Sequence, residues 1–133
     1  MPSSELESVL RGHGEYERAL REYPDVFGCY ARLRPAQQHV ACQLLEQYLR
    51  NRQRQRVHKL LKHAVRYAAD GKLTAGGPNL WIAAGDHGER HVHLDPDRCT
   101  CPMFYGEPPF DPGDEGDCSH IMAAKILRGV PHD

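Results

Sequence analysis

The sequence predicts an α+β fold, in which a helical N-terminal region precedes a small ββα unit. The helical prediction comes from residues 36–69, which contain neither proline nor glycine and repeat apolar side chains at helical spacing. The strand prediction comes from Leu80–Ala84 and Arg90–Leu94, two short segments separated by turn residues. Together these patterns place helices in the first half of the chain and strands in the second.

The segment Ser4–Tyr23 is expected to form two short helices or one broken helix. Ser4 is a suitable N-cap, and residues 12–14 interrupt the helical spacing with a Gly-His-Gly run. Pro24 ends the segment. We interpret residues 25–34 as a connection.

The segment from Pro35 to Ala69 is expected to form two helices packed as a hairpin. Proline is favoured at the first position of a helix, and Gly71 lies where a C-terminal cap is expected. Two apolar stripes are separated by Arg50–Arg56, which contains no apolar side chain. A lone long helix with a solvated middle could not bury both stripes, so the hairpin is favoured.

A change in composition marks the boundary between the two parts of the chain. Lys72–Asn79 contains a Gly-Gly-Pro run and is interpreted as a linker or turn. Residues 102–117 are rich in proline, glycine and acids, so we expect a loop, followed by a short helix over Ser119–Arg128. We therefore assign residues 1–72 to the helical region and residues 80–130 to the ββα unit.

The length of 133 residues suits one compact domain, or a small domain with a helical attachment. No apolar run approaches the roughly 18 residues that a membrane span needs. Residues 1–5 also lack the basic and then apolar layout of a signal peptide. We therefore expect an intracellular protein, cytoplasmic or nucleoid-associated, that does not bind or span a membrane.

Four side chains in the last third form two closely spaced pairs: Cys99 with Cys101, and Cys118 with His120. Zinc takes a tetrahedron of thiolate and imidazole ligands, so this set suits one zinc ion in a structural site. An odd total of five cysteines fits poorly with a disulfide framework. An iron–sulfur cluster is the chemical alternative.

The sequence motif around these ligands resembles that of the SWIM zinc finger, whose pattern is Cys-x-Cys, a variable gap, and Cys-x-His. Cys99–Phe104 spells Cys-Thr-Cys-Pro-x-Phe, and Cys118–Ala123 spells Cys-x-His-Ile-x-Ala. The resemblance covers about residues 80–128 and implies a ββα layout with zinc in a structural role. It also implies a place near nucleic acid, since SWIM fingers are credited with binding DNA or protein partners.

The small net charge of −1 hides a strong asymmetry along the chain. Residues 47–72 contain eight Lys and Arg against one Asp, whereas residues 86–117 contain nine acids against two Arg. Phosphate contacts need cations, so the basic segment is the candidate for nucleic-acid binding rather than the acidic finger. Its candidate contacts are Arg50, Arg52, Arg54, Arg56, Lys59, Lys62 and Arg66.

Three interpretations of this basic segment stay open at the level of sequence. It could bind nucleic acid, with DNA favoured and little sequence preference, in a small zinc-binding accessory protein. It could instead belong to an adaptor that recruits a DNA-processing or other partner enzyme without touching nucleic acid. It could also dock on the acidic residues 107–117, within the chain or on a second copy. No phosphate loop, dinucleotide turn or catalytic triad spacing is recognisable, so we do not expect an enzyme.

Overall fold

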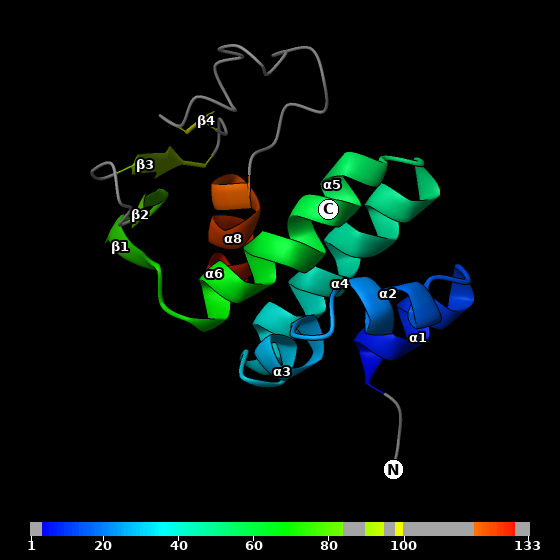
Figure 1. The fold of residues 1–133 in the computed structure, drawn as a ribbon. Helices are drawn as coiled ribbons and strands as arrows, with labels where there is room; N and C mark the ends of the chain where they lie inside the picture. Colours follow the sequence, from blue (N-terminus) through cyan, green and yellow to red (C-terminus); the bar gives the residue numbers. More distant parts are fainter. Residues whose placement is uncertain (1–3, 84–89, 95–97, 100–118, 130–133) are drawn as a thin grey trace.

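The computed structural model describes residues 4–83, 90–94, 98–99 and 119–129, and helices dominate this part (Figure 1). The helical elements are α1 (Glu5–Gly12), α2 (Tyr16–Glu22), α3 (Val26–Ala31), α4 (Pro35–Arg50), α5 (Arg54–Lys59), the π-helical turn η1 (Leu60–Ala64), α6 (Val65–Ala69) and α8 (Ser119–Arg128). The strands are β1 (Leu73–Gly77), β2 (Leu80–Ala83), β3 (Arg90–His93) and β4 (Arg98–Cys99). This mixture confirms the α+β prediction. In the described ranges, every helix is too short or too polar to cross a membrane.

The first helices follow the sequence pattern closely, with one correction. Ser4 caps α1 by accepting a hydrogen bond from the Glu7 backbone N–H at 3.2 Å. Gly14 adopts a φ of 70°, a left-handed conformation that glycine tolerates, and so separates α1 from α2. The connection expected over residues 25–34 was wrong, because α3 forms there. Its buried side chains recur at helical spacing over a segment too short to stand out in the sequence, and they are Val26, Cys29 and Tyr30.

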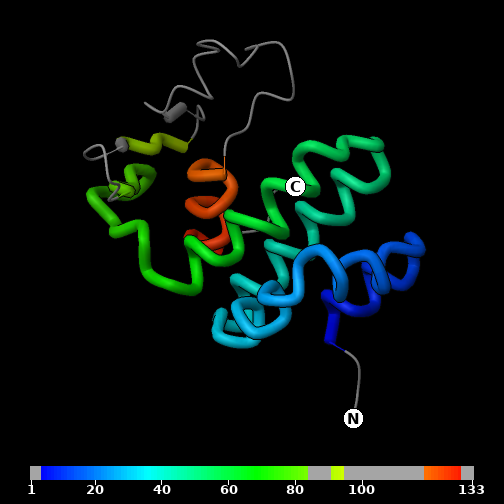
Figure 2. The backbone as a smooth tube through the Cα atoms, in the orientation of Figure 1, coloured from blue at the N-terminus to red at the C-terminus, as the bar shows by residue number. Residues whose placement is uncertain are grey.

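The predicted helical hairpin is confirmed. Helix α4 ends at Arg50, the chain turns, and the second arm runs without interruption through α5, η1 and α6 (Figure 2). Arg52 adopts a φ of 56° in this turn, a conformation that is uncommon outside glycine. The two arms bury Leu45 and Tyr48 of α4 together with Leu60 of η1. Both apolar stripes are therefore used in one core.

The four described strands form an antiparallel sheet in the order β1-β2-β3-β4. In its register Trp81 of β2 lies opposite Val92 of β3, and Val92 lies opposite Cys99 of β4. The linker or turn expected over Lys72–Asn79 was wrong, since most of it forms β1. The Gly-Gly run lies at the end of β1, where the pairing with β2 is irregular between Ala75 and Gly77.

Helix α8 joins the second unit to the helical region. It lies between the sheet and the helices α4 and α6 (Figure 1), and contacts η1 as well. Its side chains Ile121, Met122 and Ile126 are fully buried. On the α4 side, the Gln37 side-chain amide donates to the Leu127 carbonyl at 3.3 Å. The two predicted parts therefore share one hydrophobic core.

Candidate functional site

Two of the four predicted zinc ligands, Cys99 and His120, lie in elements at the junction between the sheet and α8. Cys99 is the last residue of β4, and His120 is the second residue of α8. Strand β4 contacts α8, so these two ligands belong to neighbouring elements. Cys101 and Cys118 lie outside the described residues. The assignment of all four ligands stays a prediction, and its three thiolates and one imidazole are a donor set that suits zinc.

The imidazole of His120 stacks on a ring from the helical region. Its centroid lies 5.4 Å from that of Tyr67, with an interplanar angle of 11°. Tyr67 in turn stacks on His63, with a centroid distance of 5.9 Å and an interplanar angle of 24°. Residues that hold the ring of a metal-binding histidine set its orientation toward the ion. Tyr67 of α6 is therefore placed to orient the predicted ligand His120.

These rings belong to a longer series that crosses the molecule from α8 to α2. The His63 and His58 rings contact each other edge to face, with their centroids 6.3 Å apart. The His58 and Tyr23 rings also contact each other, with their centroids 5.6 Å apart. The Tyr23 hydroxyl also lies 2.8 Å from Nδ1 of His58, within hydrogen-bond distance. We call Tyr23, His58, His63, Tyr67 and His120 the ring series.

The π-helical turn explains how the ring series is aligned. Residues five apart in a regular α-helix, such as His58 and His63, point roughly 140° away from one another. The wider turn of a π-helix closes i→i+5 hydrogen bonds and brings such residues closer to one face. η1 covers Leu60–Ala64, between His58 and Tyr67. The ring series could not be predicted from the sequence, because its members come from three separate segments and depend on this turn.

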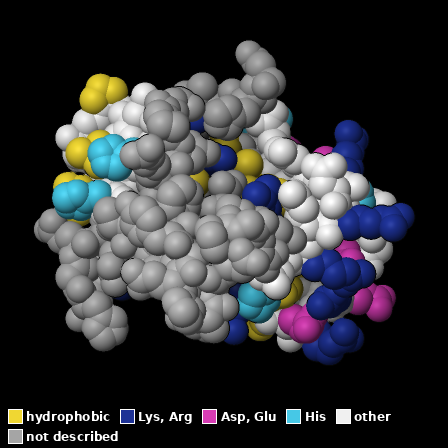
Figure 3. Space-filling model, turned by 90° about the horizontal axis from the view of Figure 1, so that it is seen from above, with side chains coloured by type: hydrophobic (Ala, Val, Ile, Leu, Met, Phe, Trp, Pro, Cys, Tyr) yellow, Lys and Arg dark blue, Asp and Glu magenta, His cyan; other side chains and the backbone are white. Residues whose placement is uncertain are grey.

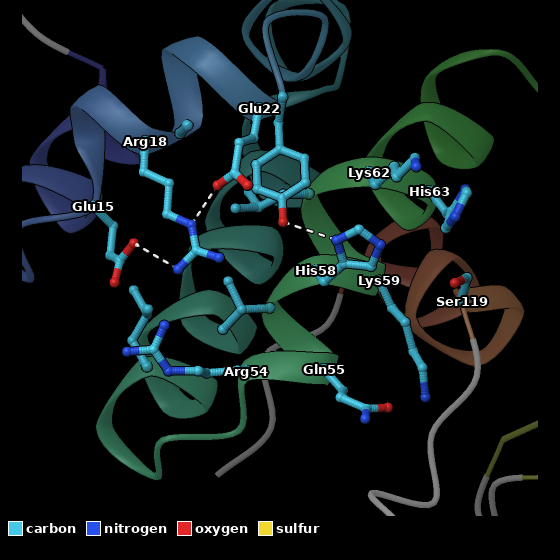
Figure 4. A pocket seen from close by; sticks show the side chains of 15 residues that line it. Glu15, Arg18, Glu22, Arg54, Gln55, His58, Lys59, Lys62, His63 and Ser119 are labelled. Atoms are coloured by element: carbon cyan, nitrogen blue, oxygen red, sulfur yellow. Dashed lines mark hydrogen bonds and ion pairs between the residues drawn. The ribbon is translucent and has the colours of Figure 1, made fainter. Parts of the chain in front are cut away.

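A cavity with a volume of about 700 Å³ lies beside the ring series. Helix α2 forms one wall and the α5–η1 arm forms the other, while Ser119 at the start of α8 closes one end. Figure 4 shows Arg18 and Arg54 at one side of this cavity, and Lys62, His63 and Ser119 at the side nearer α8. Its apolar lining comes from Ala19, Leu49, Val57 and Leu61.

The charges in this cavity are distributed unevenly between its two walls. On the α2 wall, Arg18 forms an ion pair with Glu22 and a longer one with Glu15 at 3.9 Å. On the opposite wall, Arg54 and Lys62 are exposed. Among the described side chains, no carboxylate lies within ion-pair distance of either cation. On the α5–η1 wall, Arg54 and Lys62 are therefore not held in ion pairs with described carboxylates.

Two histidines in this wall are affected by that environment. His58 is exposed, but partial desolvation by its neighbours lowers its pKa, and the neighbouring charge of Lys62 lowers it further. The same two causes, in the same order, lower the pKa of His63. Both imidazoles are therefore mostly neutral at pH 7, so that they offer ring surface and hydrogen bonds rather than charge.

The seven predicted nucleic-acid contacts do not form one band. Arg50 donates to Glu46 at 2.8 Å, and Arg66 forms an ion pair with Asp25 at 3.0 Å. Three of the remaining five line the cavity, namely Arg54, Lys59 and Lys62. Arg52 is exposed in the turn after α4. The Arg56 guanidinium lies 5.7 Å from the centre of the Tyr48 ring.

The ion-paired cations also lie away from the cavity. Arg50 lines a second hollow between α1 and α4. At the right-hand edge of the face in Figure 3, Lys and Arg side chains are interspersed with Asp and Glu. Among the described residues, Arg54 and Lys62 on the cavity side of α5 and η1 are thus cations of the predicted basic segment without a carboxylate within ion-pair distance.

Comparison with known protein families identifies the second unit. The SWIM zinc finger family matches residues 91–129, a range that contains β3 from its second residue on, β4, α8 and all four predicted ligands. No curated protein and no solved structure matches the chain. SWIM fingers are associated with zinc and with nucleic-acid or protein interaction. Residues 91–129 are therefore similar to a SWIM zinc finger, and this similarity implies that this part of the chain binds zinc.

Proposed function

We propose that this protein is a non-catalytic accessory factor that binds DNA through the cationic wall of its helical cavity. The observation that supports this proposal is the pairing state of the basic side chains. Arg54 and Lys62 are exposed and have no described carboxylate within ion-pair distance, whereas Arg50 and Arg66 are held in ion pairs. A cation that already has a carboxylate partner gains less from a phosphate, because the existing pair must first be broken.

Zinc has a structural role in this proposal. Four protein ligands would complete the tetrahedron and leave no position for an activated water. The SWIM region also has an acidic sequence, which disfavours direct contact with phosphates. We therefore assign the finger to folding α8 into the core and the helical wall to contacting DNA.

The salt dependence of DNA binding tests this division of the basic residues. Counterion release gives a log–log slope of about −0.9 per neutralised phosphate on duplex DNA. Contacts from Arg54 and Lys62 of the cavity wall, together with the exposed Arg52 of the adjoining turn, would give a slope of about −3. The double variant Arg54→Gln, Lys62→Gln should reduce it to about −1. Fluorescence anisotropy with a labelled generic duplex between 50 and 200 mM salt, a range typical of such titrations, measures the slope.

A matched control removes the same charge from the ion-paired positions. The variant Arg50→Gln, Arg66→Gln should keep most of the slope, because these cations are held by Glu46 and Asp25. Equal losses in the two double variants would contradict the assignment to the cavity wall. Absence of DNA binding at low salt would instead favour the adaptor, with the same wall facing an acidic protein surface.

A further inference from the structure

We propose that the helical cavity accepts an unstacked nucleobase, so that the protein prefers single-stranded DNA to duplex DNA. This inference rests on the proposed function and goes beyond it, because a surface that contacts only phosphates would not distinguish the two forms in this way. Its evidence is the combination of an apolar lining, a fixed set of rings and a one-sided distribution of charge.

The lining of the cavity is unsuited to a phosphate alone. Beneath the charged side chains lie Ala19, Leu49 and Leu61, which offer no hydrogen bond to an anion. The volume of about 700 Å³ is within the range of cavities that enclose a small organic ligand. A base in duplex DNA stays within its stack and must be extruded to reach such a cavity. A base in a single strand can enter without that cost.

The rings beside the cavity are held in place before any ligand arrives. His58 is exposed, and its ring is fixed by the contact with Tyr23 at 2.8 Å and by the edge of His63. Aromatic rings of this kind stack on every base, because each base has a π-face. A fixed ring loses little conformational freedom on binding, which favours association.

The charges indicate the path of the strand past this base. Glu15 and Glu22 lie on the α2 wall with Arg18, so a phosphate would be repelled there by two carboxylates. Arg54 and Lys62 lie at opposite ends of the α5–η1 wall, and Lys59 lies between them in the sequence. The phosphates on either side of the bound base would therefore follow α5 and η1 (Figure 4).

The test uses the full zinc-loaded chain and three labelled DNA probes of equal length. These are a ten-nucleotide oligothymidine, the same oligonucleotide with abasic sites in place of its central bases, and a ten-base-pair duplex. We expect the oligothymidine to bind roughly tenfold more tightly than either other probe, given the usual strength of base–aromatic stacking. His58→Ala should reduce its affinity to that of the abasic strand, and Leu20→Ala, an exposed change outside the cavity lining, should not.

The outcomes separate this inference from the proposed function. Equal affinity for the three probes would overturn the base site and leave DNA binding intact. Failure of all three probes to bind would overturn the proposed function. Thymidine monophosphate that displaces the oligothymidine at micromolar concentration would also overturn the inference, because the cavity would then serve a free nucleotide rather than a strand.

Discussion

Replacement of Ile126 by alanine should destabilise the whole helical region, although Ile126 lies in the zinc-finger half of the sequence. Its side chain is fully buried on α8, which packs against α4, α6 and η1. Truncation of a buried isoleucine to alanine costs about 2–5 kcal/mol, from lost transfer free energy and the cavity left behind. A middle value of about 3 kcal/mol corresponds to a decrease in Tm of roughly 10 °C for a chain of this size.

Thermal unfolding followed by circular dichroism at 222 nm measures this effect on the zinc-loaded protein. The matched control is Leu20→Ala, which shortens a side chain on α2 that is 46% exposed. That control should change the free energy of unfolding by no more than about 0.5 kcal/mol. If Ile126→Ala hastens zinc release but leaves the helical transition at the wild-type temperature, then α8 contributes only to the finger and the shared core is refuted.

Three further predictions address the metal, its surroundings and the core. Cys101→Ser should abolish stoichiometric zinc by elemental analysis, whereas Cys42→Ser should retain it, since Cys42 is buried beside Tyr30. Tyr67→Ala should weaken zinc binding by about 10-fold or more in a chelator competition, as losses of supporting residues do, while Tyr67→Phe keeps the stacked ring and the affinity. Burial raises the pKa of the Cys42 thiol from 9.0 to about 11, against the opposing effect of its hydrogen bond with Tyr30. Because the pKa of Cys42 is higher in the folded chain than in the unfolded chain, its contribution to the free energy of unfolding is complete below pH 9 and is lost toward pH 11. The free energy measured by urea unfolding should therefore decline over this pH range. The Cys42→Ala variant should show a smaller decline.

Much of the fold could be predicted from local sequence signals. Pro35 marked the start of α4, and the polar Arg50–Arg56 marked the turn of the hairpin, because backbone and burial preferences act over a few residues. The helix over Ser119–Arg128 and the strand ending at Ala83 followed from the same reasoning. β1 was missed because its Gly-Gly end suggests a linker, whereas pairing with β2 makes it a strand.

The candidate site was less accessible from the sequence, since it depends on contacts between distant segments. The charges of Arg50 and Arg66 are visible in the sequence, but their partners are Glu46 in the same helix and Asp25, 41 residues away. The ring series likewise assembles only when α2, the hairpin and α8 have packed. A count of basic residues therefore overestimates the charge available to a ligand.

The position of α8 implies that zinc influences the cavity without contacting a ligand there. Ser119, at the first turn of α8, closes one end of the cavity, and the adjacent His120 stacks on Tyr67. Zinc that orders the start of α8 would therefore also fix that end of the cavity and the last member of the ring series. On the proposed function, removal of zinc should weaken DNA binding even though the finger is acidic. Such weakening should appear with Arg54 and Lys62 intact, because it would arise from lost order in α8 rather than from lost charge.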